Sequence, residues 1–86
     1  MIVRIPSPLR SYTGNLSSVN SQGASVDEVL ANLNDAYPGI RFRIIDEQNR
    51  IRPHIQLFVN NELVSNLSQP VAATDVVHII AALSGG

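Results

Sequence analysis

The segment Ser25-Val-Asp-Glu-Val-Leu-Ala-Asn-Leu-Asn-Asp-Ala-Tyr-Pro-Gly39 decides the fold, because it predicts the one long helix of the chain. Its start carries a capping box: the Ser25 hydroxyl can accept a backbone N–H, while Glu28 reaches back to the Ser25 amide. Behind that cap, apolar side chains recur at the spacing of a helix face, and Pro38-Gly39 stops the pattern. The apolar positions are Val26, Val29, Leu30, Leu33, Ala36 and Tyr37. We therefore predict an amphipathic helix with one buried stripe.

Strands are predicted on both sides of this helix. Before it lie a short β-branched run, Ile2–Ile5, and a weaker strand over Leu16–Ser21 that returns along the first. After it come Ile55–Val59, its short partner Glu62–Val64 and a strongly apolar last strand over Val76–Leu83. Right-handed crossovers favour parallel first and last strands in the middle of the sheet. The expected fold is α+β, a β-grasp (ubiquitin-like) arrangement, with a mixed sheet of four to five strands covered on one face by one main helix.

The connecting segments carry turn signals. Arg10–Gly14 is expected to be a loop, because Gly14 and the asparagine after it favour a turn. Ile40–Ile45 is expected to form a second short helical turn packed under the sheet, and Asp46–Asn49 a surface turn. Asn60-Asn61 can take the positive φ values of a tight hairpin between two strands.

The chain has 86 residues, which is the size of one domain, so we expect a single domain over residues 1–86. Its composition excludes several classes of function. A formal charge of −1 argues against nucleic acid or an anionic membrane as a partner. Cysteine is absent, which excludes disulfides, thiolate metal sites and catalytic thiols. Lysine is absent too, which excludes a phosphate-binding P-loop and Schiff-base chemistry on a side chain. The start, Met1–Pro8, lacks the apolar stretch of a signal peptide, so we expect a cytoplasmic protein.

The sequence ends in Gly85-Gly86, and residues 81–86 are expected to form a flexible C-terminal tail. With glycine at about 7% of average composition, a terminal pair arises by chance in about 0.5% of chains. Glycine has no side chain, so the pair can pass through a channel too narrow for other residues. A free carboxylate resists nucleophilic attack until it is activated, for example as an acyl adenylate. Because this chain has no group for that step, a partner is expected to supply the ATP, and the chain itself is expected to bind no cofactor and no metal.

The last twelve residues, Asp75-Val-Val-His-Ile-Ile-Ala-Ala-Leu-Ser-Gly-Gly86, resemble the C-terminal signature of the ubiquitin-like sulfur-carrier family. That family includes the small subunit of molybdopterin synthase, the thiamine sulfur carrier and the cysteine-synthesis sulfur carrier, to which this chain looks most similar. Three more segments resemble the cysteine-carrier and molybdopterin-type branches, so that the resemblance covers nearly the whole chain: Leu9-Arg10 with Thr13-Gly14, Tyr37-Pro-Gly-Ile40 and Ile55-Gln-Leu-Phe-Val-Asn-Asn61. One departure is Ala81 or Ala82, where the family often has proline.

The resemblance implies a sulfur carrier that is the substrate of other enzymes. An adenylating enzyme of the ubiquitin-activating type would adenylate Gly86, which enters its channel together with Gly85. A sulfur donor would convert the adenylate to a thiocarboxylate. An acceptor enzyme that binds the same tail would pass the sulfur to a metabolite. The final acceptor, in cysteine, molybdopterin, thiamine or another pathway, stays open, as does the trimming of a longer precursor to expose Gly86.

The resemblance also implies partner-binding positions on the outer sheet face and in the tail. Strand alternation places Val77 and Ile79 on one face of the last strand and Ile80 on the other. If the first two face the helix, Ile80 points outward. The implied positions are Ile80, Leu63, Phe58, Leu83, Ser84 and Arg10, with Pro6 as a further candidate. The simpler interpretation of the apolar members is ordinary sheet surface, because scattered exposed apolar side chains are common.

Two other functions remain open on the same features. A ubiquitin-like protein modifier would use Gly86 to form isopeptide bonds with target lysines. A subunit of a larger enzyme would use the tail to complete an active site on its partner. Both end in the same tail, so the tail does not separate them from a carrier.

The remaining polar residues suggest no chemistry of their own. His54 and His78 are too far apart and too poor in neighbouring ligands to indicate zinc. Four arginines form the only basic cluster, which we interpret as a solvated surface rather than a dedicated partner site. They are Arg41, Arg43, Arg50 and Arg52.

Overall fold

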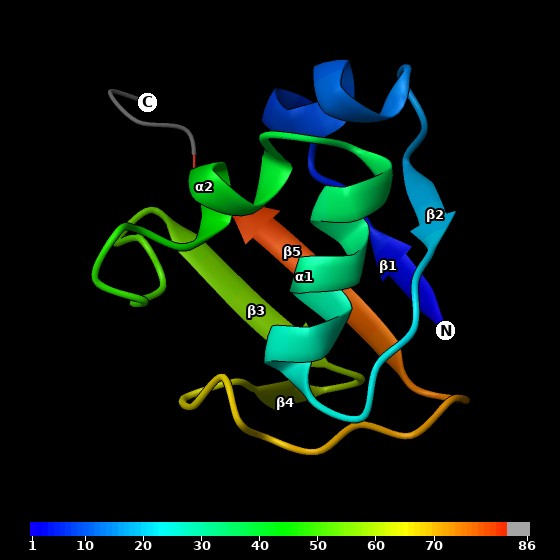
Figure 1. Ribbon diagram of the computed structural model, residues 1–86, viewed down its shortest axis with the longest axis vertical. Coiled ribbons are helices and arrows are strands. Elements are labelled where there is room, and N and C mark those ends of the chain that lie inside the picture. Colours follow the sequence, from blue (N-terminus) through cyan, green and yellow to red (C-terminus); the bar gives the residue numbers. More distant parts are fainter. Residues whose placement is uncertain (83–86) are drawn as a thin grey trace.

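The computed structural model describes residues 1–82. This part of the chain forms one mixed sheet with the main helix lying across it (Figure 1). The five strands of this part of the chain are β1 (Ile2–Arg4), β2 (Ser18–Asn20), β3 (Ile55–Val59), β4 (Glu62–Leu63) and β5 (Val76–Ala81). They lie in the order β2-β1-β5-β3-β4. β5 is parallel to β1 and antiparallel to β3. The predicted β-grasp fold is confirmed, including the parallel pairing of the first and last strands in the middle of the sheet.

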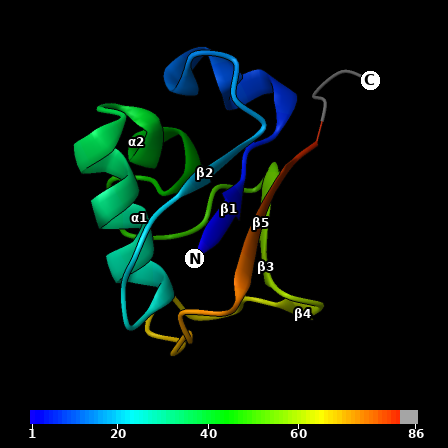
Figure 2. The ribbon, with the colours of Figure 1, turned by 90° about the vertical axis from the view of Figure 1, so that its right-hand side faces the viewer.

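Helix α1 (Val26–Ala36) covers one face of the sheet (Figure 2). Its N-cap is the predicted serine: Ser25 Oγ accepts the N–H of Glu28 at 3.3 Å. The predicted return bond is wrong by one residue, because Glu28 Oε1 accepts the N–H of Ala24 at 3.0 Å instead of the Ser25 amide. The chain enters the helix extended, with Ser25 bridged to Pro70, and this approach brings Ala24 within reach of the carboxylate.

The hydrophobic core lies between the sheet and helices α1 and α2 (Ile40–Ile44). Side chains that are at most 1% exposed come from both helices, the three central strands and the C-cap of α2: Val26, Val29, Leu30, Leu33, Ile40, Ile44, Ile45, Val3, Leu57, Val77 and Ile79. Full burial of one such side chain stabilises the fold by about 1.5–3 kcal/mol. Ala36, which the helical pattern included in the buried stripe, is exposed at the end of α1. The core therefore fixes which face of β5 points inward.

The segment Ser7–Thr13 forms a 3-10 helix, η1, where a loop over Arg10–Gly14 was predicted. Pro8 suits the first turn of such a helix, because its φ is already fixed and it has no N–H to satisfy. Leu9 buries one side of the turn against the core. The helix ends at Gly14, whose φ of 62° is a left-handed conformation that glycine adopts without steric cost.

The segments around β3 follow the prediction in outline. α2 is the expected short helical turn, and residues 46–49 form the expected surface turn. In the β3–β4 hairpin, only the first of the two asparagines, Asn60, has a positive φ (55°). Its side chain then joins the hairpin to β5: Nδ2 donates to Asp75 Oδ1 at 3.0 Å, and Oδ1 accepts the N–H of Val76 at 3.0 Å. The start of β5 is therefore held in place by the hairpin.

The last strand ends earlier than predicted. β5 ends at Ala81, which pairs with Ile55, whereas the strand was expected to reach Leu83 and the tail to begin at residue 81. The N–H of Ala82 still donates to the carbonyl of His54 at 2.8 Å. The antiparallel contact with the start of β3 therefore holds the backbone one residue beyond the strand.

Candidate functional site

The candidate site begins where β5 leaves the sheet. β5 lies between β1 and β3, and within residues 1–82 the last hydrogen bond to the neighbouring segment is the one from the N–H of Ala82 to the carbonyl of His54. The predicted tail positions Leu83, Ser84, Gly85 and Gly86 lie outside the described residues. Four residues follow Ala82, and an extended chain spans at most about 3.6 Å per residue, so Gly86 reaches no farther than about 14 Å from it. Any protein that binds Gly86 must therefore approach this end of the sheet closely.

The two faces of β5 are as the alternation predicts. Val77 is 0% and Ile79 1% exposed on the helix side, whereas Ile80 is 46% exposed on the other. The neighbouring strand follows the same rule, because Leu57 is fully buried and Phe58 is half-buried on the outer side. Ile80 therefore points away from the core, as expected.

An apolar patch lies on the outer sheet face, and we call Ile2, Phe58, Leu63, His78 and Ile80 the outer patch. Phe58 lies opposite His78 on β5 and opposite Leu63 on β4. Leu63 is 56% and Ile2 42% exposed. The predicted positions Ile80, Leu63 and Phe58 thus come from three adjacent strands and share one face. Their role in binding a partner stays a prediction.

Arg10 has a structural contact that the sequence did not indicate. Its Nε donates to the carbonyl of Ile5 at 3.0 Å, and its side chain is half-buried. This bond holds η1 against the end of β1. Pro6, the further candidate, lies within the same connection and is half-buried as well.

A second feature at the end of β5 is a groove of about 610 Å³, which we call the terminal groove. Its walls come from η1, α2, the segment before β3 and the end of β5. Among its lining residues are Tyr12, Phe42, Arg43, Arg52 and Ala82. No local sequence pattern predicts this groove, because its walls come from segments that lie far apart in the chain.

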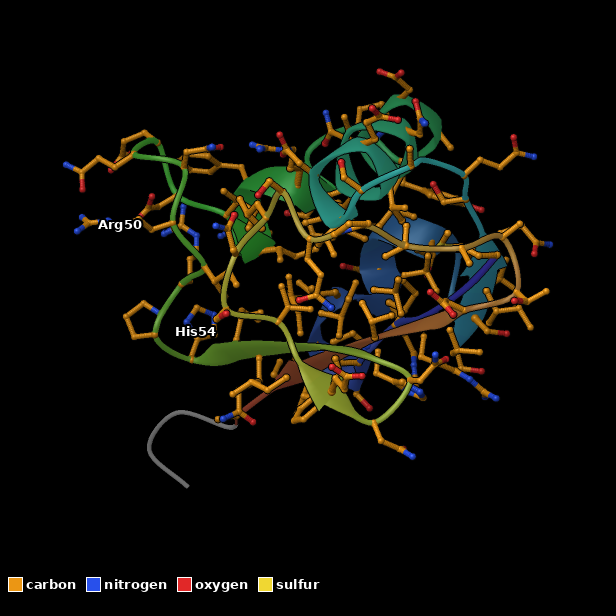
Figure 3. The ribbon with its side chains drawn as sticks, turned by 90° about the horizontal axis from the view of Figure 1, so that it is seen from below. Arg50 and His54 are labelled. Carbon is orange, nitrogen blue, oxygen red and sulfur yellow. The ribbon has the colours of Figure 1, made fainter. Side chains whose placement is uncertain are left out.

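The four arginines of the basic cluster differ in their partners. Arg41 Nη2 lies 2.9 Å from Asp27 Oδ1, and Arg50 Nε lies 3.8 Å from Asp46 Oδ2. Backbone N–H groups, first that of Arg50 and then that of Gln48, hold the pKa of Asp46 below its usual range. The Arg50 side chain extends into solvent (Figure 3). Arg50, whose side chain is 71% exposed, fits the predicted solvated surface, whereas the Arg41 side chain is 27% exposed and pairs within the chain.

The other two arginines are held in the terminal groove by neutral groups. Arg43 Nε donates to the Tyr12 hydroxyl at 2.7 Å, and this hydrogen bond raises the pKa of Arg43. Arg52 Nε donates to the carbonyl of Phe42 at 2.7 Å, and its guanidinium carbon lies 4.6 Å from the centre of the Phe42 ring. Within residues 1–82 neither guanidinium group forms an ion pair, although the charge of Arg52, after the N–H groups named above, also lowers the pKa of the Asp46 carboxyl.

The two histidines lie apart. His54 is exposed just before β3 (Figure 3), and His78 belongs to the outer patch. Among residues 1–82, no three His, Cys, Asp or Glu side chains gather closely enough to hold a metal ion. In the same part of the chain, no helix has the length and apolar character needed to cross a bilayer.

Comparison with known proteins identifies relatives along nearly the full length. The model of the ThiS family matches residues 3–86. The sulfur carrier protein CysO of Mycobacterium tuberculosis is 34% identical over 89 residues, which cover 98% of this chain and 96% of CysO. The fold is similar to that in the crystal structure of the Amycolatopsis orientalis BexX/CysO complex, with a TM-score of 0.91, 33% identity and coverage of 99% and 98% of the two chains. SAMP1 from Haloferax volcanii is also similar, with a TM-score of 0.79, 26% identity and coverage of 100% and 98%.

Proposed function

Because the chain belongs to the ThiS family and is a sulfur carrier protein, we propose that it holds its transferable sulfur as a thiocarboxylate on Gly86. The observation that carries this proposal is that the sequence of this sulfur carrier contains no cysteine. No side chain can then hold the sulfur as a persulfide, so the carbonyl carbon of Gly86 is the position left for it. The two glycines at the end suit a narrow enzyme channel.

The chemistry requires activation by a partner. A carboxylate oxygen of Gly86 attacks the α-phosphorus of ATP on an adenylating enzyme of the ubiquitin-activating type, and pyrophosphate leaves. A sulfide ion then attacks the carbonyl carbon, AMP leaves and a thiocarboxylate remains; a persulfide donor would instead leave an acyl disulfide, from which a second thiol of the donor displaces the thiocarboxylate while the donor forms a disulfide. On an acceptor enzyme that sulfur displaces a leaving group from a carbon of the metabolite, and water hydrolyses the resulting thioester to return the carboxylate and release the metabolite as a thiol. In this scheme the chain is a substrate rather than an enzyme and binds no cofactor of its own.

The position of β5 supports the proposal. Its hydrogen bonds to β1 and β3 fix the backbone up to Ala82, and the short reach of the tail keeps the partner at this end of the sheet. We propose that the adenylating enzyme docks on the outer patch through Ile80, Leu63 and Phe58. Leu83 and Ser84 would then lead Gly85-Gly86 into its channel. Arg10 would act by holding the loop beside β1, or by contacting the partner directly.

The comparisons support protein partners for this chain. A CysO protein forms a complex with BexX, and we propose that this chain likewise binds the protein to which it delivers sulfur. Similarity to CysO favours an acceptor in cysteine biosynthesis. We place the carrier in the cytoplasm, where ATP is available to its adenylating enzyme.

Intact mass spectrometry tests the proposal. Protein isolated from its own organism without added reductant should include a species heavier by the difference between sulfur and oxygen, located at Gly86 by fragmentation. A variant without Gly86 should lack this species and unfold at the same temperature, because the described core does not include that residue. If the wild-type chain never acquires the mass, even with ATP, adenylating enzyme and a sulfide source present, the thiocarboxylate is refuted.

The modifier function has one observation in its favour, which is the similarity to SAMP1, a small archaeal modifier protein by name. A modifier would form isopeptide bonds through Gly86 after the same adenylation. Denaturing gels probed for the chain would then show adducts of high mass that disappear when Gly86 is deleted. Copurification of a stoichiometric larger subunit would instead indicate the third function, a subunit that completes an active site.

A further inference from the structure

The terminal groove combines two features that the proposed carrier function leaves unexplained. It holds two oriented cationic groups, those of Arg43 and Arg52, and it contains no acidic side chain among its lining residues. It also includes Ala81 and Ala82, the last described residues before the tail. A positively charged hollow therefore lies directly beside the segment that partners must bind.

The guanidinium groups of Arg43 and Arg52 are held in orientations suited to binding a carboxylate. Each uses its Nε for a bond within the chain, Arg43 to Tyr12 and Arg52 to Phe42, both at 2.7 Å. Within residues 1–82 the terminal nitrogens of these two arginines donate no hydrogen bond. A guanidinium fixed at Nε presents its remaining N–H groups as a fork, which matches the two oxygens of a carboxylate. Stacking on Phe42 further restricts the orientation of Arg52.

The length of the tail decides what can fill the groove. Gly86 lies at most about 14 Å from Ala82, so an enzyme that activates Gly86 brings the rim of its channel over this end of the sheet. Resting on the carrier function above, we infer that the terminal groove receives an acidic side chain from the rim of the adenylating enzyme. Its carboxylate pairs with Arg43 and Arg52. The contact orients the tail toward the channel, and the outer patch supplies apolar contact on the neighbouring face.

The first test is a titration followed by NMR of the ¹⁵N-labelled full chain. The probe is the peptide acetyl-Gly-Glu-Phe-Glu-Gly-amide, and its control is the same peptide with both glutamates replaced by glutamine. We expect saturable shifts confined to amides around the groove, such as those of Arg43 and Ala82. Hydrogen bonds to charged groups are strong enough that Arg43→Gln and Arg52→Gln should each weaken binding about tenfold. Arg50→Gln removes the same charge outside the groove and should leave binding unchanged.

The second test uses the adenylating enzyme itself, through ATP–pyrophosphate exchange at increasing carrier concentration. Arg43→Gln and Arg52→Gln should raise KM about tenfold and leave kcat unchanged, and the effect should shrink at high salt because the pair lies near the surface. Arg43→Lys and Arg52→Lys keep the charge and lose the fork, so they should recover part of the affinity. Thermal unfolding of each variant confirms that it is folded.

Several results would overturn the inference. Shifts spread over the whole surface, equal binding of the glutamine peptide, or tighter groove binding by inorganic phosphate or AMP would each do so. An unchanged KM in the groove variants would mean that the adenylating enzyme is not the occupant. A chain truncated after Ser84 separates this inference from the carrier proposal: it cannot be adenylated at Gly86, yet it should still bind the acidic peptide.

Discussion

Two adjacent isoleucines on opposite faces of β5 allow the docking proposal to be separated from stability. Ile80 is 46% exposed, and Ile79 is 1% exposed. Complete burial of an isoleucine side chain stabilises by about 1.5–3 kcal/mol. Docking on the outer patch can bury roughly the remaining half of Ile80, which amounts to about 1 kcal/mol, or about a fivefold change in affinity. Ile80→Ala should therefore raise the KM of adenylation about fivefold without changing kcat.

The matched control is Ile79→Val, which removes one buried methylene and lowers the free energy of unfolding by about 0.5–1.5 kcal/mol. Ile80→Ala is expected to cost a similar amount, about 0.5–1 kcal/mol, because it removes cross-strand packing over Gln56. ATP–pyrophosphate exchange measures KM, and urea unfolding measures the stability of both variants. If Ile80→Ala leaves KM unchanged, or if Ile79→Val raises it equally, the outer patch is not the docking surface.

Three further predictions concern the scaffold. Ser25→Ala removes the N-cap of α1 and should lower the free energy of unfolding by about 1 kcal/mol in urea; a loss within error would mean that the cap is not needed. Hydrogen bonds, first from the N–H of Ala72, lower the pKa of Asp75, so its stabilising effect is present above about pH 4 and is lost as the pH falls through the lowered value. Asp75→Asn should therefore destabilise at pH 7 and converge with wild type once the pH is below the lowered pKa of Asp75, and a urea midpoint difference that stays constant with pH would contradict this. Gly23→Ala places a Cβ 2.7 Å from a backbone nitrogen of α1 and should cost about 1–3 kcal/mol, more than Gly14→Ala, whose Cβ meets nothing within 4 Å but whose φ is positive; the reverse order of thermal unfolding temperatures would contradict it.

The elements that could be predicted are those with a local signal. The i, i+3, i+4 spacing and the Ser25 cap located α1, and alternation assigned the inner and outer faces of β5 correctly. Both patterns indicate which side of a helix or strand faces the core, because the spacing of a few neighbouring apolar residues determines that side. The parallel pairing of β1 and β5 followed from the handedness of the crossover rather than from any single residue.

The features that escaped prediction depend on residues far apart in the chain. The bond from Arg43 to Tyr12 joins residues 31 positions apart, and it is one reason why the terminal groove exists. In the sequence, Arg43 and Arg52 look like the solvated Arg50, because all three belong to one run of closely spaced arginines that also includes Asp46 and Glu47. The 3-10 helix η1 was taken for a loop because its turn depends on Leu9 reaching the core, which no short-range pattern reveals.

The parallel pairing of the chain's two terminal strands has a mechanical consequence. Ile2 lies opposite Val76, so a pull on the amino end and an opposite pull on the carboxyl end load the β1–β5 ladder lengthwise. Its hydrogen bonds then share the force and must rupture together instead of opening one at a time like a zipper. An enzyme that pulls on the tail while the amino end is held therefore loads these hydrogen bonds in shear.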